Sequence, residues 1–468
     1  MFQPTLPVNG PRTRSMGVKL IVVCVLALLT TIPALFVESL VSERRHSAAE
    51  VTHDISSHVG GQQTFLGPTL AIPYSIPPQS KAEATQRGVY LVFPTSASAS
   101  IKTSTEERHR SLFKVPVFKA DLDLNSDFDL TGVPASAPPN AELDWSRAEL
   151  VVGVSDARGA LADATLAAGG PPVTLVPAQI SSDLSLGDDT TQLTRLVLFG
   201  APAPAAARPS ARFQASAQLH FSGAQRIALL AYGKSTSVQV QGDWPNPSFD
   251  GGFLPVSRTV TPGGFTAQWS VPFIARGVRA EGQARTITGL EATALGVSFV
   301  ELADPYQSVD RSLKYVLLFL GLLFLTYFVF EVTTGRRIHP AQYLLVGVAQ
   351  IIFYLLLLSF AERVGFDWAF LAAGGATVLL LSLNAGWIFL SRVQAVRAFV
   401  VFALLYTLIY LLLRLEDNAL LVGAVASFLA VAATMYFTRN IDWYGSLNPA
   451  LPAAPAPPST PSRESFLD

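Results

Sequence analysis

Cysteine and charge are the two scarcest features of this 468-residue chain. A single cysteine, Cys24, excludes an intrachain disulfide. Only 14% of the residues are charged, against about 25% in an ordinary soluble protein. The formal net charge of −1 leaves no basic surplus for nucleic acid. The composition therefore predicts neither a disulfide scaffold nor a nucleic-acid partner.

Recognisable catalytic motifs are missing as well. The sequence contains no G-x-S-x-G, H-E-x-x-H or C-x-x-C string. Ser111 and Lys114 fit the S-x-x-K pattern of penicillin-recognising enzymes, but their strand-like surroundings would place them on opposite faces. Gly233-Lys234-Ser235 resembles the end of a P-loop, yet Ala228 stands where the upstream glycine is required. We therefore expect no catalytic residue and no cofactor.

A metal site is not expected either. Three histidines follow the first apolar run, with no carboxylate or cysteine completing a set at ligand spacing: His46, His53 and His58. The sequence favours solvated histidines near lipid headgroups.

Long hydrophobic runs dominate what is present. Each is close to the twenty helical residues that cross a hydrocarbon core of about 30 Å. The sequence predicts six transmembrane helices, approximately at residues 18–41, 313–332, 341–361, 368–390, 396–413 and 419–437. The first run has a competing interpretation as a cleaved signal peptide, with Ala48-Ala49 near the cleavage site. We favour an uncleaved anchor because the run exceeds a typical signal core.

The basic residues orient these runs. The positive-inside rule assigns to the cytoplasm the loops with Arg336 and Arg337, with Arg392 and Arg397, and the residues before position 18. Arg311 and Lys314 lie on the side predicted to be periplasmic and are weak evidence against this orientation. The predicted organisation is a cytoplasmic leader (1–17), an anchor (18–41), a periplasmic region (42–312), a five-helix bundle (313–437) and a disordered cytoplasmic Pro/Ala/Ser-rich tail (438–468).

The periplasmic region has a soluble composition and β-strand patterning. After a juxtamembrane helix that ends at Gly60-Gly61, short alternating runs recur between turn residues. Strands are expected at 88–93, 112–119, 149–154, 195–199, 212–221, 235–241, 265–273 and 294–301. We predict an antiparallel β-sandwich-like fold, with two possible subdomains that meet near residue 205 in the Ala/Pro-rich stretch.

Several long strings resemble the CreD family of bacterial inner-membrane proteins over most of the chain. They include Gly61-Gln62-Gln63, Ser155-Asp156-Ala157-Arg158-Gly159, Asp243-Trp244-Pro245-Asn246-Pro247-Ser248-Phe249, the run from Ile338 to Gly347, and Leu415-Glu416-Asp417-Asn418. The resemblance implies an inner-membrane protein of cell-envelope integrity, associated with a two-component system and with tolerance of β-lactams and colicins. It implies no reaction and no catalytic residues.

Three mechanisms remain open from the sequence. The first is binding or scaffolding of an envelope protein or cell-wall component by the periplasmic domain, with the bilayer as the other partner. The second is an envelope hydrolase with a site assembled by folding from Asp156, Ser248 and Asp250. The third is a small transporter, which needs Gln350, Asn384 and Glu331 around one cavity.

Two stretches are candidate contact sites. Trp244, Pro245, Pro247 and Phe249 form a rigid aromatic turn, for which we favour a corner of the core over a partner-binding edge. A cytoplasmic interface is the second candidate, and its residues are Glu331, Arg336, Arg337 and His339.

Overall fold

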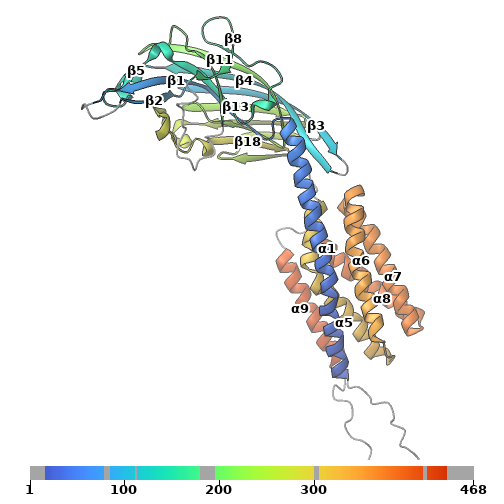
Figure 1. Cartoon of the computed structure of the whole chain (residues 1–468). Coiled ribbons are helices and arrows are strands. Elements are labelled where there is room, and N and C mark those ends of the chain that lie inside the picture. The colour runs from blue at the N-terminus through green and yellow to red at the C-terminus, as the bar shows by residue number, and fades with distance from the viewer. Residues whose placement is uncertain are drawn as a thin grey trace, which may run out of the picture. The chain divides into compact units, whose positions relative to one another are not determined.

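The computed structural model describes residues 16–78, 85–110, 113–179, 196–299, 305–414 and 419–439. The chain forms two compact units, which are coloured along the chain in Figure 1. Residues 46–302 make a β unit, and residues 1–45 with 303–468 make a helical unit. Most of the predicted leader and nearly all of the predicted tail lie outside the described residues.

The helical unit contains the apolar helices. Among the described residues, five helices are long and apolar enough to cross a membrane. They are α1 (Met16–His58), α5 (Val316–Thr334), α6 (Pro340–Val364), α7 (Phe366–Phe389) and α8 (Arg392–Arg414). Helix α9 (Ala419–Thr438) occupies the position of the sixth predicted crossing. Helix α4 (Pro305–Lys314) precedes α5 and is amphipathic.

Helix α1 joins the predicted anchor and the predicted juxtamembrane helix in 43 continuous residues. It packs closely on α6 because Gly347 has no side chain. A Cβ built at Gly347 would lie 2.6 Å from Cγ2 of Thr30 and 3.1 Å from the ring of Phe324. A small residue at a helix contact is the common way for membrane helices to approach.

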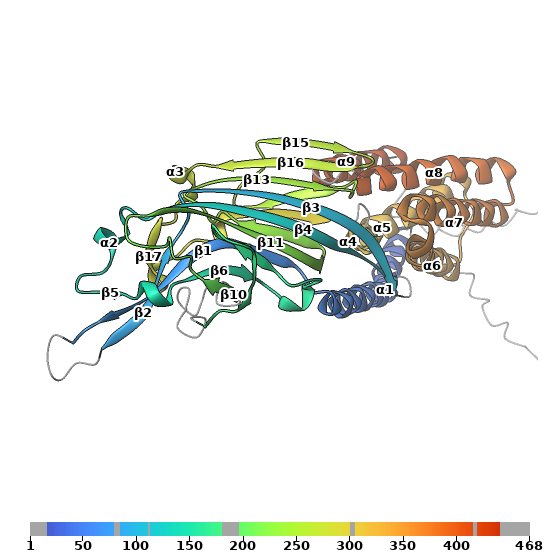
Figure 2. The ribbon, with the colours of Figure 1, turned by 90° about the horizontal axis from the view of Figure 1, so that it is seen from above.

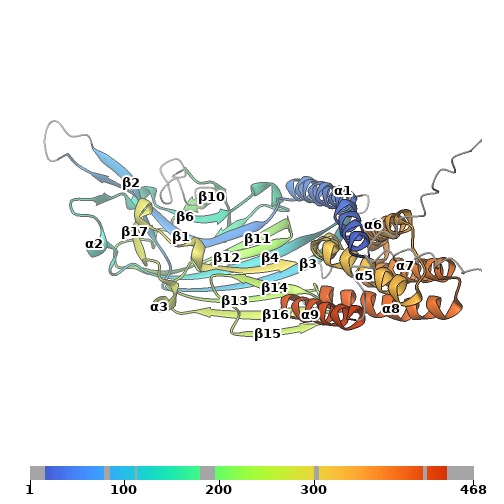
Figure 3. The same cartoon turned by 90° about the horizontal axis from the view of Figure 1, so that it is seen from below.

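The β unit consists of two sheets (Figures 2 and 3). The ten-stranded sheet contains β1 (Gln63–Ile76), β2 (Gln86–Val92), β5 (Glu142–Leu143), β6 (Glu149–Val154), β9 (Val176–Pro177), β10 (Val197–Pro202), β12 (Arg226–Leu230), β14 (Pro247–Gly251), β17 (Glu281–Gln283) and β18 (Ala294–Phe299). The eight-stranded sheet contains β3 (Ser96–Arg110), β4 (Phe113–Asp129), β7 (Thr165–Ala167), β8 (Val173–Thr174), β11 (Arg212–Ala224), β13 (Ser235–Gly242), β15 (Ser257–Thr261) and β16 (Gly264–Val271).

The sheets are mixed, so the prediction of an antiparallel sandwich-like fold is correct for most strand pairs and wrong for two of them. Strand β12 pairs in parallel with β1, and β13 pairs in parallel with β3. These two pairs also join strands that precede residue 205 to strands that follow it. The Ala/Pro-rich stretch is therefore a connection within one two-sheet domain, and the suggested division near residue 205 is not found.

Facing side chains of the two sheets form one core. Phe65 of β1 meets Phe221 of β11 at 5.4 Å between ring centroids, and Phe118 of β4 meets Phe299 of β18 at 5.2 Å. Tyr232 is fully buried, and its hydroxyl lies 3.1 and 3.0 Å from the main-chain oxygens of Ser98 and Asn125. Burial raises the pKa of this hydroxyl. Each such aromatic side chain contributes about 2–3 kcal/mol of burial energy.

Candidate functional site

The end of α1 is joined to the β unit through the side chain of Gln63. This residue is fully buried at the start of β1. Its Nε2 donates to the main-chain oxygens of Gly60 (2.8 Å) and Asp156 (2.9 Å), and its Oε1 accepts from the Ser155 hydroxyl at 3.2 Å. One amide thus ties the helix end to the turn that follows β6.

Strand β11 completes this junction. The hydroxyl of Ser222 lies 3.0 Å from the main-chain oxygen of Val59 and 3.1 Å from that of Gly159. The approach requires glycine, because a Cβ at Gly60 would lie 2.6 Å from Cα of Gly159. Gly60 also has a positive φ of 91°. The first two family-like strings of the sequence therefore meet here, and their residues have a structural role.

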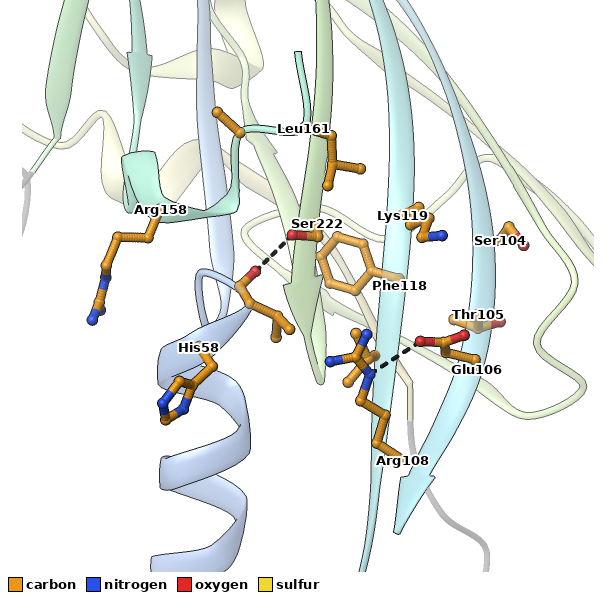
Figure 4. Close-up of a pocket in the computed structure, with 13 residues that line it drawn as sticks. His58, Ser104, Thr105, Glu106, Arg108, Phe118, Lys119, Arg158, Leu161 and Ser222 are labelled. Carbon is orange, nitrogen blue, oxygen red and sulfur yellow. Dashed lines mark hydrogen bonds and ion pairs between the residues drawn. The ribbon is translucent and has the colours of Figure 1, made fainter. Parts of the chain in front are cut away.

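A cleft of about 330 Å³ lies beside this junction, between the end of α1 and strands β3 and β4 (Figure 4). Val59, Val117 and Phe118 form apolar parts of its wall. The polar lining residues that Figure 4 labels are His58, Ser104, Thr105, Glu106, Arg108, Lys119, Arg158 and Ser222. Three cationic side chains and one carboxylate line the cleft, so its wall has a basic surplus.

The cations differ in how they are paired. Arg108 donates to Glu106 at 3.0 Å. Arg158 donates to both oxygens of Asp156, at 3.0 and 2.6 Å, and these hydrogen bonds lower the pKa of the Asp156 carboxyl. Lys119 is exposed and has no ion pair within the described part of the chain. Of the three cations that line the cleft, the Lys119 ammonium is the one without an ion pair among the described residues.

Of the three predicted hydrolase residues, the two aspartates are bound by neighbouring side chains and the serine is exposed. Asp250 accepts from Arg226 at 2.9 Å and from Ser298 at 2.5 Å. Asp156 lies in the turn that follows β6 and is bound by Arg158. Ser248 is exposed on β14. Within the described residues, no group of three or more His, Cys, Asp or Glu side chains could hold a metal ion. Nothing in this arrangement favours the hydrolase hypothesis.

The aromatic turn that was predicted as a contact site is mainly a corner of the core. Trp244 is buried and packs edge to face on Phe299 at 6.3 Å. Phe249 is half-buried and meets the rings of Phe265 and Trp269, both at 5.9 Å. Pro245 is exposed, and Pro247 begins β14, which is an edge strand of the ten-stranded sheet. A proline is tolerated on such an edge strand because its missing N–H is not needed there.

The predicted cytoplasmic-interface residues are placed in two groups. Glu331 is 1% exposed and accepts from Lys19 of α1, from the Tyr343 hydroxyl (3.0 Å) and from the Ile338 main chain (3.0 Å). Arg336, Arg337 and His339 are exposed, and His339 caps α6 by accepting from the main-chain N–H of Ala341 at 3.2 Å. Only the exposed group is accessible to a partner.

The predicted transport residues do not share a cavity with one another among the described pockets. Gln350 is fully buried and accepts from the Tyr406 hydroxyl at 2.6 Å. Asn384 donates to the Tyr327 hydroxyl at 3.3 Å. A separate groove of about 440 Å³ lies between α7 and α8, with Trp368, Gly375 and Ala403 in its wall, and none of the three transport candidates lines it. The three residues have different partners and line no common pocket among those described, which argues against the transporter hypothesis.

The cleft cations were missed by sequence reasoning. Lys119 ends a predicted strand, so its exposure could have been expected from alternation. Arg108 lies in β3, a strand whose Ser/Ala pattern was not recognised. Their proximity depends on the β3–β4 pairing, in which Thr105 lies opposite Phe118 and Ser104 opposite Lys119.

The comparisons with known proteins agree with this architecture. The family model for inner membrane protein CreD matches residues 15–444. The chain is 31% identical over 435 residues to inner membrane protein CreD of Escherichia coli (strain K12), which covers 91% of this chain and 93% of that protein. The chain therefore belongs to the CreD family of inner membrane proteins.

Proposed function

We propose that this protein supports cell-envelope integrity by binding an anionic envelope component in the cleft of its β unit. The observation that carries the proposal is a cleft lined by Arg108, Lys119 and Arg158, of which Lys119 has no ion pair within the described residues. Cations favour phosphate and carboxylate groups, and arginine binds both in a bidentate manner. Lipid phosphates and cell-wall carboxylates share this chemistry.

The rigidity of the wall supports binding in preference to a merely solvated surface. Gln63 and Ser222 fix the helix end and the Asp156 turn, so Arg158 is held in place before a ligand arrives. Preorganised groups lose less conformational entropy on binding than mobile ones. The apolar parts of the wall exclude water from one side of a bound anion, which strengthens the electrostatic attraction.

The direct test is charge reversal of the uncommitted cation. We expect Lys119→Glu in the full-length protein to weaken binding of an anionic probe about tenfold, because attraction becomes repulsion worth ~1.4 kcal/mol. The probes are phosphatidylglycerol vesicles and soluble muropeptides, in separate titrations that distinguish the two sources. The same variant should lower survival under β-lactam or colicin challenge at normal protein level.

The matched control is Lys102→Glu, an exposed lysine on β3 that does not line the cleft. Equal losses in both variants would indicate a general surface-charge effect and would contradict the proposal. Binding of both probes that does not depend on Lys119 would contradict it as well.

A further inference from the structure

A second surface, at the edge strand β15, has the features of a polypeptide-binding site. Strand β15 is the outermost strand of the eight-stranded sheet (Figures 2 and 3). Within the described residues it pairs with β16 alone. All five of its residues are exposed. Its outer edge therefore presents main-chain groups that have no partner strand in the described structure.

The direction of these main-chain groups follows from the β15–β16 hairpin. Thr261 lies opposite Gly264 across a two-residue turn. In an antiparallel pair, alternate residues exchange hydrogen bonds with the partner, and the residues between them direct their N–H and C=O groups to the other side. Arg258 and Val260 are such intervening residues. Together they offer two donors and two acceptors to an added strand.

The two outward-directed residues of this strand carry one cationic and one apolar side chain. Val260 is 48% exposed, and Val256, at the bend just before the strand, is 75% exposed. Val260 lies two residues from Arg258 and so shares its face of the sheet. The Arg258 guanidinium lies 5.8 Å from the centroid of the Phe249 ring, which itself packs between the two sheets. The edge thus presents a cationic and an apolar side chain on one face.

We propose that β15 docks an extended segment of a partner protein by strand addition. Main-chain hydrogen bonds would give such a complex its affinity, and the alternating side chains its specificity. The complementary segment carries an acidic and an apolar residue at alternate positions, because Arg258 selects a carboxylate while Val260 selects an apolar group. This surface is separate from the cleft residues, so the two sites are independent.

A lone charge on an edge strand also protects proteins from unwanted pairing. The two roles make opposite predictions. A protective charge lowers the affinity for every strand, whereas a selecting charge raises the affinity for strands of opposite charge. The test therefore compares peptides that differ only in the sign of the central residue.

The experiment uses the purified full-length protein in detergent and two fluorescent peptides, Thr-Val-Thr-Asp-Thr-Val-Thr and its counterpart with Lys in the centre. We expect the Asp peptide to bind at least about tenfold more tightly than the Lys peptide. Arg258→Glu should reverse this order. Val260→Pro removes one outward N–H without removing a bond to β16, so it should weaken both peptides.

The control variant is Lys102→Glu, which should leave both affinities unchanged, and circular dichroism should show that each variant is folded. The cleft variant Lys119→Glu should bind the Asp peptide normally, so that failure of one site is distinguishable from failure of the other. Equal affinity of the two peptides for the wild-type protein, or unchanged preference in Arg258→Glu, would overturn the proposal. Absence of binding at millimolar peptide would overturn it too.

Discussion

Gln63 shows how one buried side chain can join a helix end to a turn that is far away in the sequence. It satisfies the main-chain oxygens of Gly60 and Asp156, and it accepts from Ser155. Buried polar groups that lose a partner cost about 1–3 kcal/mol each. The string Gly61-Gln62-Gln63 therefore has a structural role, and its occurrence in the family pattern does not indicate a catalytic role.

The substitution Gln63→Leu should destabilise the β unit by ~2 kcal/mol, because it leaves the main-chain oxygen of Gly60 without the Gln63 donor and removes one of the two donors to the main-chain oxygen of Asp156, the other being the Gly159 N–H. Thermal unfolding of the detergent-solubilised protein, followed by circular dichroism, measures this change. Gln62→Leu is the matched control, since Gln62 is exposed. Similar melting temperatures for the two variants would contradict the role assigned to Gln63.

Arg276 is a second buried polar residue that sequence reasoning missed. It is 3% exposed, donates to the main-chain oxygen of Ala231 at 2.7 Å, and lies 4.3 Å from the centroid of the Phe93 ring. Burial lowers its pKa to about 10. Its main-chain partners come from a turn and a strand end that the sequence does not place together, so no spacing rule could have identified it.

At the scale of elements, the strands found from the sequence share a visible alternation, and the missed strands lack it. Strand β6 was predicted with its observed bounds, Glu149–Val154. Strand β1 was missed because nearly all of it is buried on both faces, and it contains Gly67, Pro68 and Pro73, which normally indicate turns. Strand β3 was missed because its Ser/Ala alternation carries little apolar contrast.

The cleft could not be predicted from the sequence either. It needs β3 beside β4 and the end of α1 beside β11, which are pairings between distant segments. Local patterns predict which face of a strand is exposed, but they do not specify its neighbours. The hydrophobic runs, in contrast, are local signals, and five of the six predicted runs lie in helices that are long and apolar enough to cross a membrane among the described residues.

A buried ion pair contributes to the packing of α1 within the helical unit. Lys19 of α1 donates to Glu331 of α5, and it also donates to the main-chain oxygen of Ile338 at 2.9 Å. Lys19 is 21% exposed at its side chain, whereas Glu331 is 1% exposed. Removal of one partner leaves a charge in a low-dielectric surrounding, at a cost of ~3–5 kcal/mol.

A double-mutant cycle tests this attachment. Lys19→Met should be the most harmful change, because it leaves the buried Glu331 carboxylate without its cation. Glu331→Leu should cost less, since the partly exposed lysine can extend to the interface. The double variant should recover part of the loss, as judged by thermal stability and folded yield in detergent. Strictly additive losses would indicate that the two residues do not interact.

At the scale of the whole molecule, the composition change along the chain corresponds to the two units. The predicted boundary at residue 312 lies ten residues after the boundary of the β unit at Leu302. The difference arises from α4, which is amphipathic and was not recognised as a helix. Asp310 of α4 accepts from Lys314 at 3.4 Å and from Arg45 at 3.5 Å. Lys314, one of the two cations that argued against the predicted orientation, is therefore paired with a carboxylate of its own helix.

The predicted orientation can be tested with the chain's own cysteine content. With Cys24→Ser as the background, Gln239→Cys on the exposed face of β13 should react with a membrane-impermeant maleimide in spheroplasts. Arg337→Cys, also exposed, should react only after lysis, because the positive-inside rule places it in the cytoplasm. The reversed pattern would place the β unit in the cytoplasm and would remove the cleft from the envelope components proposed as its ligands. Labelling of both positions before lysis would indicate leaky spheroplasts. A cytoplasmic marker enzyme in the supernatant identifies such preparations. The two labelling rates therefore decide the orientation only in preparations that retain the marker.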